Sequence, residues 1–454
     1  MASTYLTRTP GSAGDRKKWT LSGWYKRSAN AADYLLSSGQ YNSTQLSQIL
    51  FEGDNYFNVA FYSSGASLEG HLETNRKFTD PAAFYHIVVA VDTAQASSSD
   101  RVKIYVNGVQ QTSFKTETYP AQDYETSINN NVAQNIGRRE GSGFFNGAMA
   151  HVHFCDGQAY AASDFGETDS TSGIWVAKTS PSVSYGTNGY FLKFASGASG
   201  TDSSGNGNNM TVVGSLTNLK DTPDNNFAIL NPLNNENVDC TYSNGNTTVT
   251  NTGQWRGFIS SLGMWSGKWY TEFKITGTNA QNGIAFGIGK AGDSTSTANM
   301  ESGNNGYASK YAYGYERWAA NANKTNNATT TGGYGTTMAE NDIGMIAFDG
   351  ENGTIWTGVN GTWDNSATSA EIAAGTTTNA MFSSIVVDNP FFFTCSIEGT
   401  SVSPYVNWNF GNGYFGTTAI SSAGSVSTGD DSQFEYDVPT GFYGLNTNNL
   451  GSYS

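Results

Sequence analysis

The chain has 454 residues, of which only 13% are charged and 13% are aromatic, and this length suffices for two or three domains. Disordered chains are poor in aromatic residues, so the composition excludes a disordered protein. A formal net charge of −15 excludes nucleic acid as a partner, because phosphate binding requires a basic surface.

The N-terminal stretch 1–19 contains no apolar signal-peptide segment, and no apolar run in the chain approaches the ~20 residues of a membrane helix. We therefore expect synthesis in the cytoplasm, with no signal peptide and no membrane insertion. The three cysteines, Cys155, Cys240 and Cys395, are odd in number and far apart, so they form neither a disulfide framework nor a paired metal motif. The acidic exterior nevertheless suits exposure to an external medium.

The first half of the chain alternates short strand-like segments with polar turns. In FYHIVVAVD (84–92), the side chains of Ile87, Val89 and Val91 fall on one strand face, which suits a core. Residues 101–108 alternate in the same way and end in Asn-Gly, a strong hairpin signal. Further strands are predicted at 17–28, 34–39, 47–53, 56–64, 109–114, 134–139 and 144–158. Short strands at this spacing predict a β-sandwich.

The order of these segments resembles the concanavalin-like, laminin-G-type sandwich. The matching stretches are 19–28, 84–92, 101–108, 135–139 and 145–157. The amino-acid sequence also resembles that of a group of marine bacteriophage virion structural proteins. The similar segments are the start, TYLTRTPGSAG, and residues 163–178, 185–194 and 200–209. This second resemblance implies that the protein belongs to a virus particle.

Residues 200–235 are rich in Gly, Ser and Asn at their start and show little regular patterning, so we predict a connector there. The predicted domains are therefore 1–199 and 236–454. In the second, 267–275 alternates as a strand, and 341–363 contains two strands around the turn GENG.

The second half resembles a SPRY domain in the strand GKWYTEF, in the hairpin 341–363 and in the late strand 404–415. Its end, 434–450, resembles the end of phage SPRY-containing proteins. The Gly/Ser-rich insertion at 416–432 departs from that pattern. The fold class that we predict is all-β, with two tandem antiparallel β-sandwiches: a concanavalin/laminin-G-like jelly roll followed by a SPRY-like bent sandwich.

Two candidate metal sites arise from the first half. His151, His153 and Cys155 share one strand face, but together they span roughly 13 Å, too far for one ion. We expect this face to be solvated, with no metal. Laminin-G-type sandwiches often bind calcium at loop tips, and acidic tips occur at Asp54-Asn55 and Asp100. These oxygens fall short of the 6–8 ligands that calcium takes, so calcium stays possible with no ligands assigned and no cofactor is predicted.

No catalytic constellation is visible. Glycoside cleavage needs paired carboxylates, and Asp349 and Glu351 sit beside Gly350 and Gly353 in what we interpret as a turn. No GxSxG nucleophile motif occurs. The phrase GNGYFG (411–416) fits GxGxxG, but no helix pattern follows it to bind a dinucleotide phosphate. We therefore expect a protein that is not an enzyme.

Aromatic clusters are the remaining candidates for binding. Tyr313, Tyr315 and Trp318 lie between the Asn/Gly/Thr-rich stretches 293–310 and 319–337, which we predict to be display loops. Aromatic rings give a large contact area for stacking on sugars or peptides. The alternative is that these rings fill the sandwich core.

These observations lead us to expect a bacteriophage virion surface protein, made in the host cytoplasm and displayed as a capsid decoration, a fibre or a tail-associated adhesin. Its expected partners are other virion proteins and a host cell-surface glycan or protein. We also expect a homo-oligomer, because repeated copies of a weak site gain avidity. The alternatives are a dedicated receptor-binding tail fibre that recognises host glycan and a glycan-cleaving tailspike, which the missing carboxylate pair disfavours.

Overall fold

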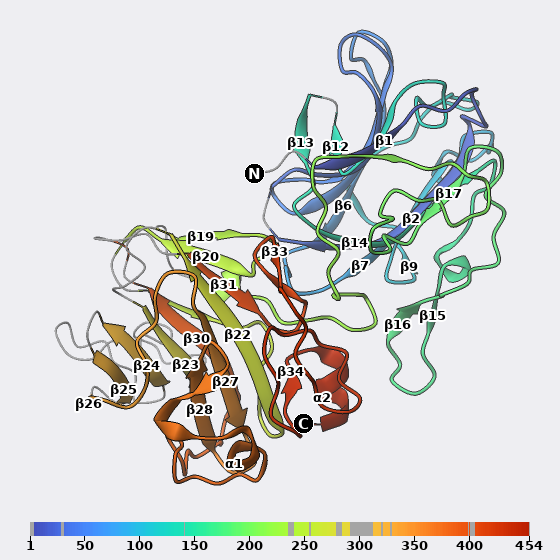
Figure 1. The fold of residues 1–454 in the computed structure, drawn as a ribbon. Helices are drawn as coiled ribbons and strands as arrows, with labels where there is room; N and C mark the ends of the chain where they lie inside the picture. Colours follow the sequence, from blue (N-terminus) through green and yellow to red (C-terminus); the bar gives the residue numbers. More distant parts are fainter. Residues whose placement is uncertain are drawn as a thin grey trace. The chain divides into compact units, whose positions relative to one another are not determined.

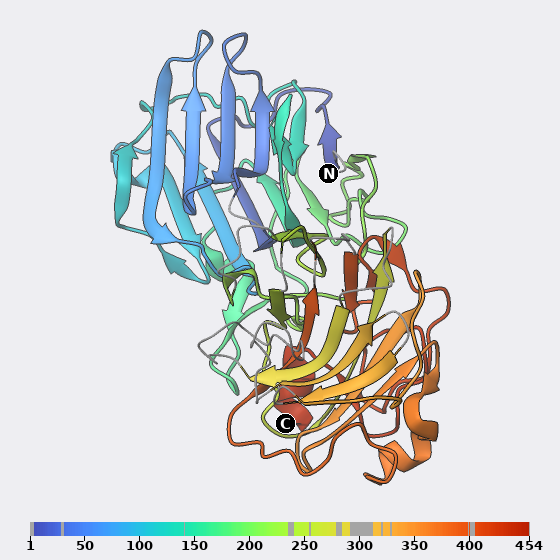
Figure 2. The same ribbon diagram turned by 90° about the vertical axis from the view of Figure 1, so that its left-hand side faces the viewer.

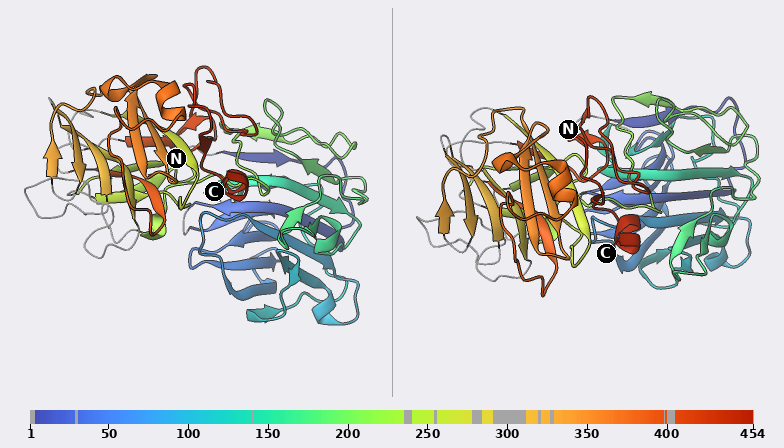
Figure 3. Two further views of the ribbon diagram at one scale, coloured as in Figure 1. Left: turned by 90° about the horizontal axis from the view of Figure 1, so that it is seen from below. Right: turned by 60° about the horizontal axis from the view of Figure 1, so that its bottom comes forward.

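The chain forms two compact units, Met1–Asn218 and Leu219–Ser454 (Figure 1). The computed structural model describes residues 4–28, 31–139, 141–234, 240–253, 256–277, 284–290, 312–318, 321–326, 329–397, 399 and 405–453. Strands account for nearly all of the regular structure in each unit, as Figure 3 shows from two further directions. The prediction of an all-β protein with two tandem antiparallel sandwiches is confirmed.

The first unit is a sandwich of two antiparallel sheets. The larger, eight-stranded sheet has the order β10 (Phe114–Thr118), β6 (Leu68–Lys77), β5 (Tyr56–Tyr62), β4 (Leu46–Phe51), β3 (Asp33–Gly39), β11 (Gln134–Ile136), β1 (Tyr5–Arg8) and β18 (Thr211–Val213). The smaller, six-stranded sheet has the order β17 (Tyr190–Leu192), β14 (Gly147–Asp156), β2 (Lys18–Arg27), β7 (Tyr85–Asp92), β8 (Val102–Val106) and β9 (Val109–Gln110). Figure 2 shows β3 to β6 side by side in blue.

The core of this unit lies between the two sheets and follows the period-2 pattern of the sequence. Ile87, Val89 and Val91 of β7 are fully buried in it, as their alternation predicts. The predicted hairpin also forms, since Val106 of β8 pairs with Val109 of β9. The two turn residues between them, Asn107 and Gly108, both have positive φ, which an Asn-Gly turn of this kind requires.

Short elements cover the ends and the outer side of these sheets. Two ribbons belong to the first unit: β12 (Arg138–Arg139) with β13 (Ser142–Phe144), and β15 (Gly166–Thr168) with β16 (Trp175–Ala177). The 3-10 helices among the described residues are η1 (Ser98–Asp100), η2 (Ala162–Asp164), η3 (Pro232–Asn234) and η4 (Asp364–Ser366). The described α-helices are α1 (Ser369–Ala373) and α2 (Thr447–Tyr453), and neither is long and apolar enough to span a membrane.

The segment that we predicted as a connector, 200–235, belongs to the two units instead of linking them as a free linker. Residues 211–213 form β18, which pairs with β1 at the edge of the larger sheet. Downstream, Phe227 to Leu230 are buried within the second unit. The Gly/Asn-rich turn near the start of this segment is also ordered, because the Asp202 carboxylate accepts from the backbone N–H groups of Phe191, Ser204 and Asn208. Its polar composition gave no sequence signal for this order.

The second unit is also a sandwich of two sheets. One has the order β19 (Cys240–Ser243), β20 (Thr248–Asn251), β31 (Tyr405–Asn409), β22 (Lys268–Thr276), β27 (Ile343–Asp349), β28 (Thr354–Val359) and β29 (Thr362–Trp363), with β34 (Tyr443–Gly444) parallel to β22. The other has the order β21 (Arg256–Ile259), β30 (Phe391–Ile397), β23 (Ile284–Lys290), β24 (Ala312–Trp318), β25 (Asn321–Asn326) and β26 (Thr329–Thr331). A ribbon of β32 (Tyr414–Phe415) and β33 (Thr418–Ala419) lies outside both.

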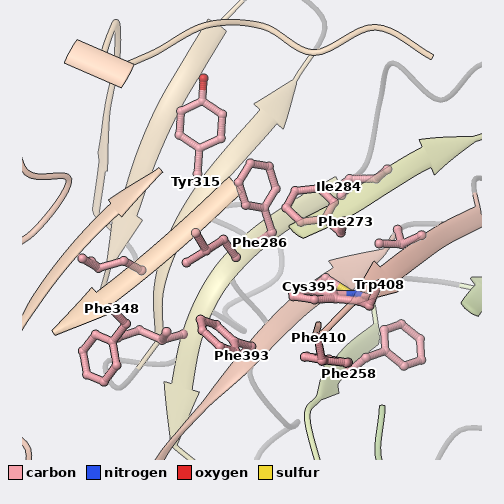
Figure 4. Packing of buried hydrophobic residues seen from close by; sticks show 14 of the residues in the cluster. Phe258, Phe273, Ile284, Phe286, Tyr315, Phe348, Phe393, Cys395, Trp408 and Phe410 are labelled. Carbon is pink, nitrogen blue, oxygen red and sulfur yellow. The ribbon is translucent and has the colours of Figure 1, made fainter. Parts of the chain in front are cut away.

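Aromatic side chains from both sheets fill the core of the second unit (Figure 4). Phe273 of β22 packs on Phe286 of β23 with ring centroids 4.3 Å apart, and Trp408 stacks on Phe410 at 5.2 Å. The opposite face of β22 is also covered, because a second cluster joins Tyr270 to Phe434 of the C-terminal segment. Both faces of this strand are therefore buried from Trp269 to Phe273, which its sequence alternation alone does not predict.

Candidate functional site

The three aromatic residues that we predicted to bind a ligand lie on β24, and the two whose side chains the structure describes do not form an exposed patch. Tyr315 is fully buried in the core, and its hydroxyl donates to the Thr336 carbonyl at 2.6 Å. Tyr313 is half-buried, with its ring centroid 5.4 Å from that of Phe382. The side chain of Trp318 lies outside the described residues. Alternate residues of a strand share a face, so Tyr315 is corrected from a surface anchor to a core residue.

The two predicted display loops have different outcomes. The stretch 293–310 lies outside the described residues. The stretch 319–337 contains β25 and β26, which extend the six-stranded sheet of the second unit. This part of the chain is therefore corrected from a loop to two paired strands, whose Asn- and Thr-rich composition gave a weak strand signal.

His153 and Cys155 are buried and His151 is half-buried at an irregularity of β14, so our expectation of a solvated strand face is corrected. The His153 ring stacks on Phe191 of the neighbouring strand β17, with centroids 3.9 Å apart. Phe165 and Tyr185, which follow β14 in the chain, also pack on it, and the Tyr185 hydroxyl lies 2.9 Å from His153 Nδ1. Burial lowers the pKa of His153 well below its usual range and raises the pKa of the Cys155 thiol to about 12. Within the described ranges no three His, Cys, Asp or Glu side chains are grouped to hold a metal ion.

The acidic loop tips that we considered for calcium have other partners. The Asp54 carboxylate pairs with Lys115 at 3.4 Å, and Asp100 pairs with Lys103 at 3.0 Å. The Asn55 side-chain oxygen accepts from the buried Arg27 guanidinium at 2.9 Å. These cationic partners engage the oxygens that a calcium ion would need.

The two motifs considered for chemistry in the second unit are turns. Asp349 is fully buried, and one oxygen accepts the backbone N–H groups of Glu351 and Asn352 at 3.0 and 2.9 Å. This geometry is a side-chain-capped turn and leaves no carboxylate pair for acid–base chemistry. In GNGYFG, Gly411, Gly413 and Gly416 have positive φ, and the strand β33 follows in place of a helix.

A group of polar side chains lies on the outer face of the eight-stranded sheet of the first unit. On β4, β5 and β6, alternate residues enter the core, and the remaining ones point outward. The register places Leu50, Asn58 and Glu73 in one row across these strands. The same register places Gln48, Ala60 and His71 in the next row. We call these six residues the polar rows.

A hydrogen-bond network links the polar rows to their neighbours. The Asn58 amide nitrogen donates to Glu52 Oε1 at 3.0 Å and lies 2.7 Å from His71 Nε2. Because an amide nitrogen only donates, His71 Nε2 is unprotonated in this arrangement. Glu73 accepts from Lys115 at 3.0 Å and from the Thr116 hydroxyl at 3.2 Å. Asn58 of β5 thus links Glu52, the residue that follows β4, to His71 of β6.

The ionisable groups of this network are perturbed by their surroundings. Burial, followed by the negative charges of Glu73 and Asp54, raises the pKa of Glu52. Burial lowers the pKa of His71, while the nearby Glu73 acts in the opposite direction. Desolvation disfavours the charged forms of both groups, so the face combines a partly desolvated carboxyl with a neutral imidazole.

Two acceptors in the polar rows have no hydrogen-bond partner within the described part of the chain. These are Gln48 Oε1 and Asn58 Oδ1, and each belongs to a residue more than nine-tenths buried. Most buried polar atoms in proteins are satisfied, and an unsatisfied one costs about 1–3 kcal/mol. Both oxygens are also closed to solvent, so an external donor would reach them only after the side chains that cover them move aside.

Tyrosine rings flank the polar rows. Tyr34 lies opposite Leu50 in the register, with the Arg139 guanidinium 5.4 Å from its ring. Tyr62 shares the outward face of β5, and Tyr41, which is 45% exposed, packs against it at 5.4 Å. Tyrosine offers an apolar ring and a polar hydroxyl, the combination that suits a sugar ring with its C–H face and hydroxyl groups.

Our sequence analysis predicted strands at 47–53 and 56–64 but not this site. The signal that could have revealed it is a polar residue placed between core residues in successive strands. Gln48 in SQILFE and Asn58 in FNVAFY are such residues. Such alternation also describes any solvated sheet face. Only the burial of Gln48 and Asn58, and the register that aligns them, separate the site from an ordinary surface.

Comparison with known proteins supports the fold of the first unit. Residues 2–163 match the family model Laminin_G_3, described as the concanavalin A-like lectin/glucanases superfamily. The N-terminal part of the chain is therefore similar to this superfamily over residues 2–163, in agreement with the sandwich fold of the first unit. No curated protein matches the chain.

Among solved structures, the chain is similar to the SPRY domain of human HERC1, with 20% identity over 37% of this chain and 91% of that one and a TM-score of 0.28. It is also similar to a native heptameric SAP-like pentraxin from Limulus polyphemus, with 12% identity over 39% and 86% and a TM-score of 0.28. The TRIM65 PSpry domain shows 9% identity over 40% and 88% and a TM-score of 0.29. Similarities of this extent indicate nothing about what the chain binds.

Proposed function

We propose that the protein binds carbohydrate without cleaving it, through the polar rows of the first unit, and serves as an attachment protein on the surface of a bacteriophage virion. The match to a lectin and glucanase superfamily supports the ligand class. The proposal that the protein belongs to a virion rests on the segments 163–178, 185–194 and 200–209, whose sequences resemble those of phage structural proteins.

The observation that carries the proposal is the pair of unsatisfied acceptors, Gln48 Oε1 and Asn58 Oδ1. Sugar hydroxyls are donors, and a glycan lying across β4 and β5 would bring several of them to this face, where they would reach the two oxygens once the side chains that close these atoms to solvent move aside. The Asn58 amide nitrogen is held by Glu52 and His71, so its carbonyl oxygen is fixed in place before the ligand arrives. Such preorganisation favours binding because little side-chain freedom remains to be lost.

Binding is favoured over hydrolysis because the carboxylates of this face are already engaged. Both oxygens of Glu73 accept hydrogen bonds, from Lys115 and Thr116, and Glu52 accepts from Asn58. A glycosidase needs one carboxyl as proton donor and a second one directed at the sugar or at a water molecule. The tailspike alternative therefore stays the weaker proposal.

The test is binding of the intact protein to an array of bacterial surface glycans. The variants Gln48→Ala and Asn58→Ala each remove one acceptor, and we expect affinity to fall about tenfold, since a lost hydrogen bond of this kind is worth ~1–3 kcal/mol. The matched control is Gln110→Ala, which removes an exposed amide from β9 of the other sheet. Thermal melting checks that each variant is folded.

The outcomes separate the parts of the proposal. Unchanged glycan binding by both variants, with folding intact, would show that the polar rows are not the site. Shortened glycan chains after incubation would overturn the non-enzymatic proposal, and Glu52→Gln and Glu73→Gln would then be the first variants to test. Immunogold labelling of phage particles addresses location, and labelling of fibre tips alone would favour the dedicated receptor-binding tail fibre.

A further inference from the structure

A polar pocket lies in the second unit, on the outward face of its eight-stranded sheet. It has a volume of about 230 Å³ and is lined chiefly by Asn244, Lys274, Thr276, Asn341, Asn407 and Phe415. Pockets for drug-sized ligands measure about 300–1,000 Å³. A pocket of this size suits a single small ring with polar substituents.

The strand register explains why these side chains meet. Lys274 of β22 lies directly opposite Asn407 of β31, which in turn lies opposite Thr248 of β20. The neighbouring residue Phe273 enters the core, so Lys274 points outward. The next row on the same face holds Thr276 opposite Tyr405. The turn between β32 and β33 completes the wall, and its Gly416 comes so close that an added Cβ would lie 2.8 Å from Asn407 Oδ1.

A directed chain of hydrogen bonds sets the polarity of the pocket. The Asn244 amide donates to the Thr248 hydroxyl at 3.0 Å, and that hydroxyl donates to Asn407 Oδ1 at 2.9 Å. The Asn407 amide then donates to the Thr276 hydroxyl oxygen at 3.0 Å. The proton of the Thr276 hydroxyl is left to donate to a ligand, because a hydroxyl that accepts one bond can still donate another.

Lys274 is the ionisable residue among those that line the pocket. It is half-buried, and it forms no ion pair within the described part of the chain. Three other strand lysines of the same unit do have partners: Lys268 pairs with Asp349 at 3.7 Å, Lys290 pairs with Asp388, and Lys324 donates to the Met381 carbonyl at 2.8 Å. A partly buried ammonium without a carboxylate, in a chain of net charge −15, is a place for an external anion.

Aromatic rings add an apolar surface beside these polar groups. Phe415 is buried and lines the pocket, and Tyr405 is 46% exposed on the same strand face as Thr276. An exposed ring beside hydroxyl and amide groups suits the apolar C–H face of a sugar. One ammonium matches one negative charge, which a sugar carboxylate carries.

We propose that this pocket binds a carboxylated monosaccharide unit, such as a hexuronic acid. Its carboxylate pairs with Lys274, its hydroxyls contact Asn244 and Thr276, and its ring stacks on Tyr405. The site lies in the second unit and shares no residue with the polar rows, so it stands or fails independently of the function proposed above.

The test is isothermal titration of the full chain with sodium glucuronate, and with glucose and sodium acetate as comparison ligands. We expect glucuronate to bind, glucose to bind at least tenfold more weakly, and acetate to bind more weakly than glucuronate. Lys274→Gln should lower glucuronate affinity about tenfold, because a charge-assisted hydrogen bond is lost. Lys274→Arg should retain binding, and Lys220→Gln, at an exposed lysine of the same unit outside the pocket, should match the wild type.

Several results would overturn the proposal. Absence of glucuronate binding by the folded wild-type chain would remove it, and so would equal binding by Lys274→Gln. Acetate that binds as tightly as glucuronate would reduce the pocket to a simple anion site. Glucuronate binding that survives in Asn58→Ala but is lost in Lys274→Gln supports this pocket even if the polar rows bind no glycan.

Discussion

At the scale of single residues, Asn58 shows how a side chain becomes functional through its neighbours. Its amide nitrogen is engaged by Glu52 and His71, while its carbonyl oxygen has no partner in the described ranges. An asparagine on an ordinary sheet face would turn both ends toward water. Fixing one end leaves the other as an oriented acceptor, and that asymmetry is what makes this position a candidate for sugar recognition.

Buried Glu272 gives the second unit a pH response. It accepts from the backbone N–H groups of Glu435 and Tyr436 and from the Tyr270 hydroxyl, and burial raises its pKa from 4.5 to about 7. Between these values the folded state holds a proton that the unfolded state releases. The contribution of Glu272 to the free energy of unfolding is therefore present in full below pH ~4.5 and is lost as the pH rises through 7. The total change in the free energy of unfolding is about 3 kcal/mol.

We expect Glu272→Gln to flatten this dependence, because the amide cannot titrate. Urea unfolding at pH 5 and pH 8 would measure it, as the difference in the free energy of unfolding between wild type and variant at each pH. Glu351→Gln, at an exposed turn position, is the matched control. An equal pH slope in wild type and Glu272→Gln would contradict the assignment.

Buried His86 gives the first unit the opposite response. Its Nδ1 accepts from Trp175 Nε1 at 3.0 Å, so its proton sits on Nε2 and is donated to the Ser22 hydroxyl at 2.9 Å. Burial lowers its pKa from 6.5 to about 3. Stability from this group is present above pH ~6.5 and is lost as pH falls toward 3.

We expect His86→Asn to remove about 2 kcal/mol of the stability loss between pH 6.5 and pH 4.5, since each unit of pKa shift is worth 1.36 kcal/mol. Calorimetric melting of both proteins at the two pH values would show it. If the first unit of the variant still loses as much stability as the wild type on acidification, other groups are responsible.

At the scale of elements, the C-terminal segment is a structural part of the second sandwich. Phe434 and Phe442 are fully buried against the outward face of β22 and β28, with Phe434 4.8 Å from Tyr270 and Phe442 6.2 Å from Trp356. We expect Phe434→Ala and Phe442→Ala each to lower the free energy of unfolding of the second unit by about 3–5 kcal/mol. Tyr436→Ala, at a half-buried position, should cost less.

Urea unfolding followed by tryptophan fluorescence would test this expectation by comparing each variant with the wild type, because the buried Trp269, Trp356 and Trp408 report on the second unit and the buried Trp19 and Trp24, which the substitutions leave unchanged, on the first. Equal effects of the three substitutions would show that the segment is not packed as described. A shift in the unfolding of the first unit would count against two units that fold separately.

The elements also show what the sequence could predict. Alternation over β7, β8 and β27, with the Asn107-Gly108 turn, was enough to predict strands and sandwiches. It failed where a strand is covered on both faces, as at Cys155 of β14 and Tyr270 of β22, because the alternation within a strand does not show which other segments will pack on its second face. The polar rows escaped prediction for a related reason, since their register depends on strand pairing that no single segment encodes.

At the scale of the whole molecule, the chain presents two separate candidate sites, one in each unit, and single lectin-like sites are weak. We therefore propose a homo-oligomer or a repeated arrangement on the particle, where avidity can exceed single-site affinity by 10²–10⁴. Light scattering of the purified protein and copy counting on virions would test this. A protein that stays monomeric and is present once per particle would contradict it.

The measurement that most directly tests the central claim is hydrogen–deuterium exchange of the full chain with and without a bound bacterial surface glycan. We expect slower exchange in β4, β5 and β6, at 46–51, 56–62 and 68–77, because the glycan covers the outward face that carries Gln48 and Asn58. A glycan that binds with no protection of these three strands would contradict the claim that the polar rows of the first unit bind carbohydrate.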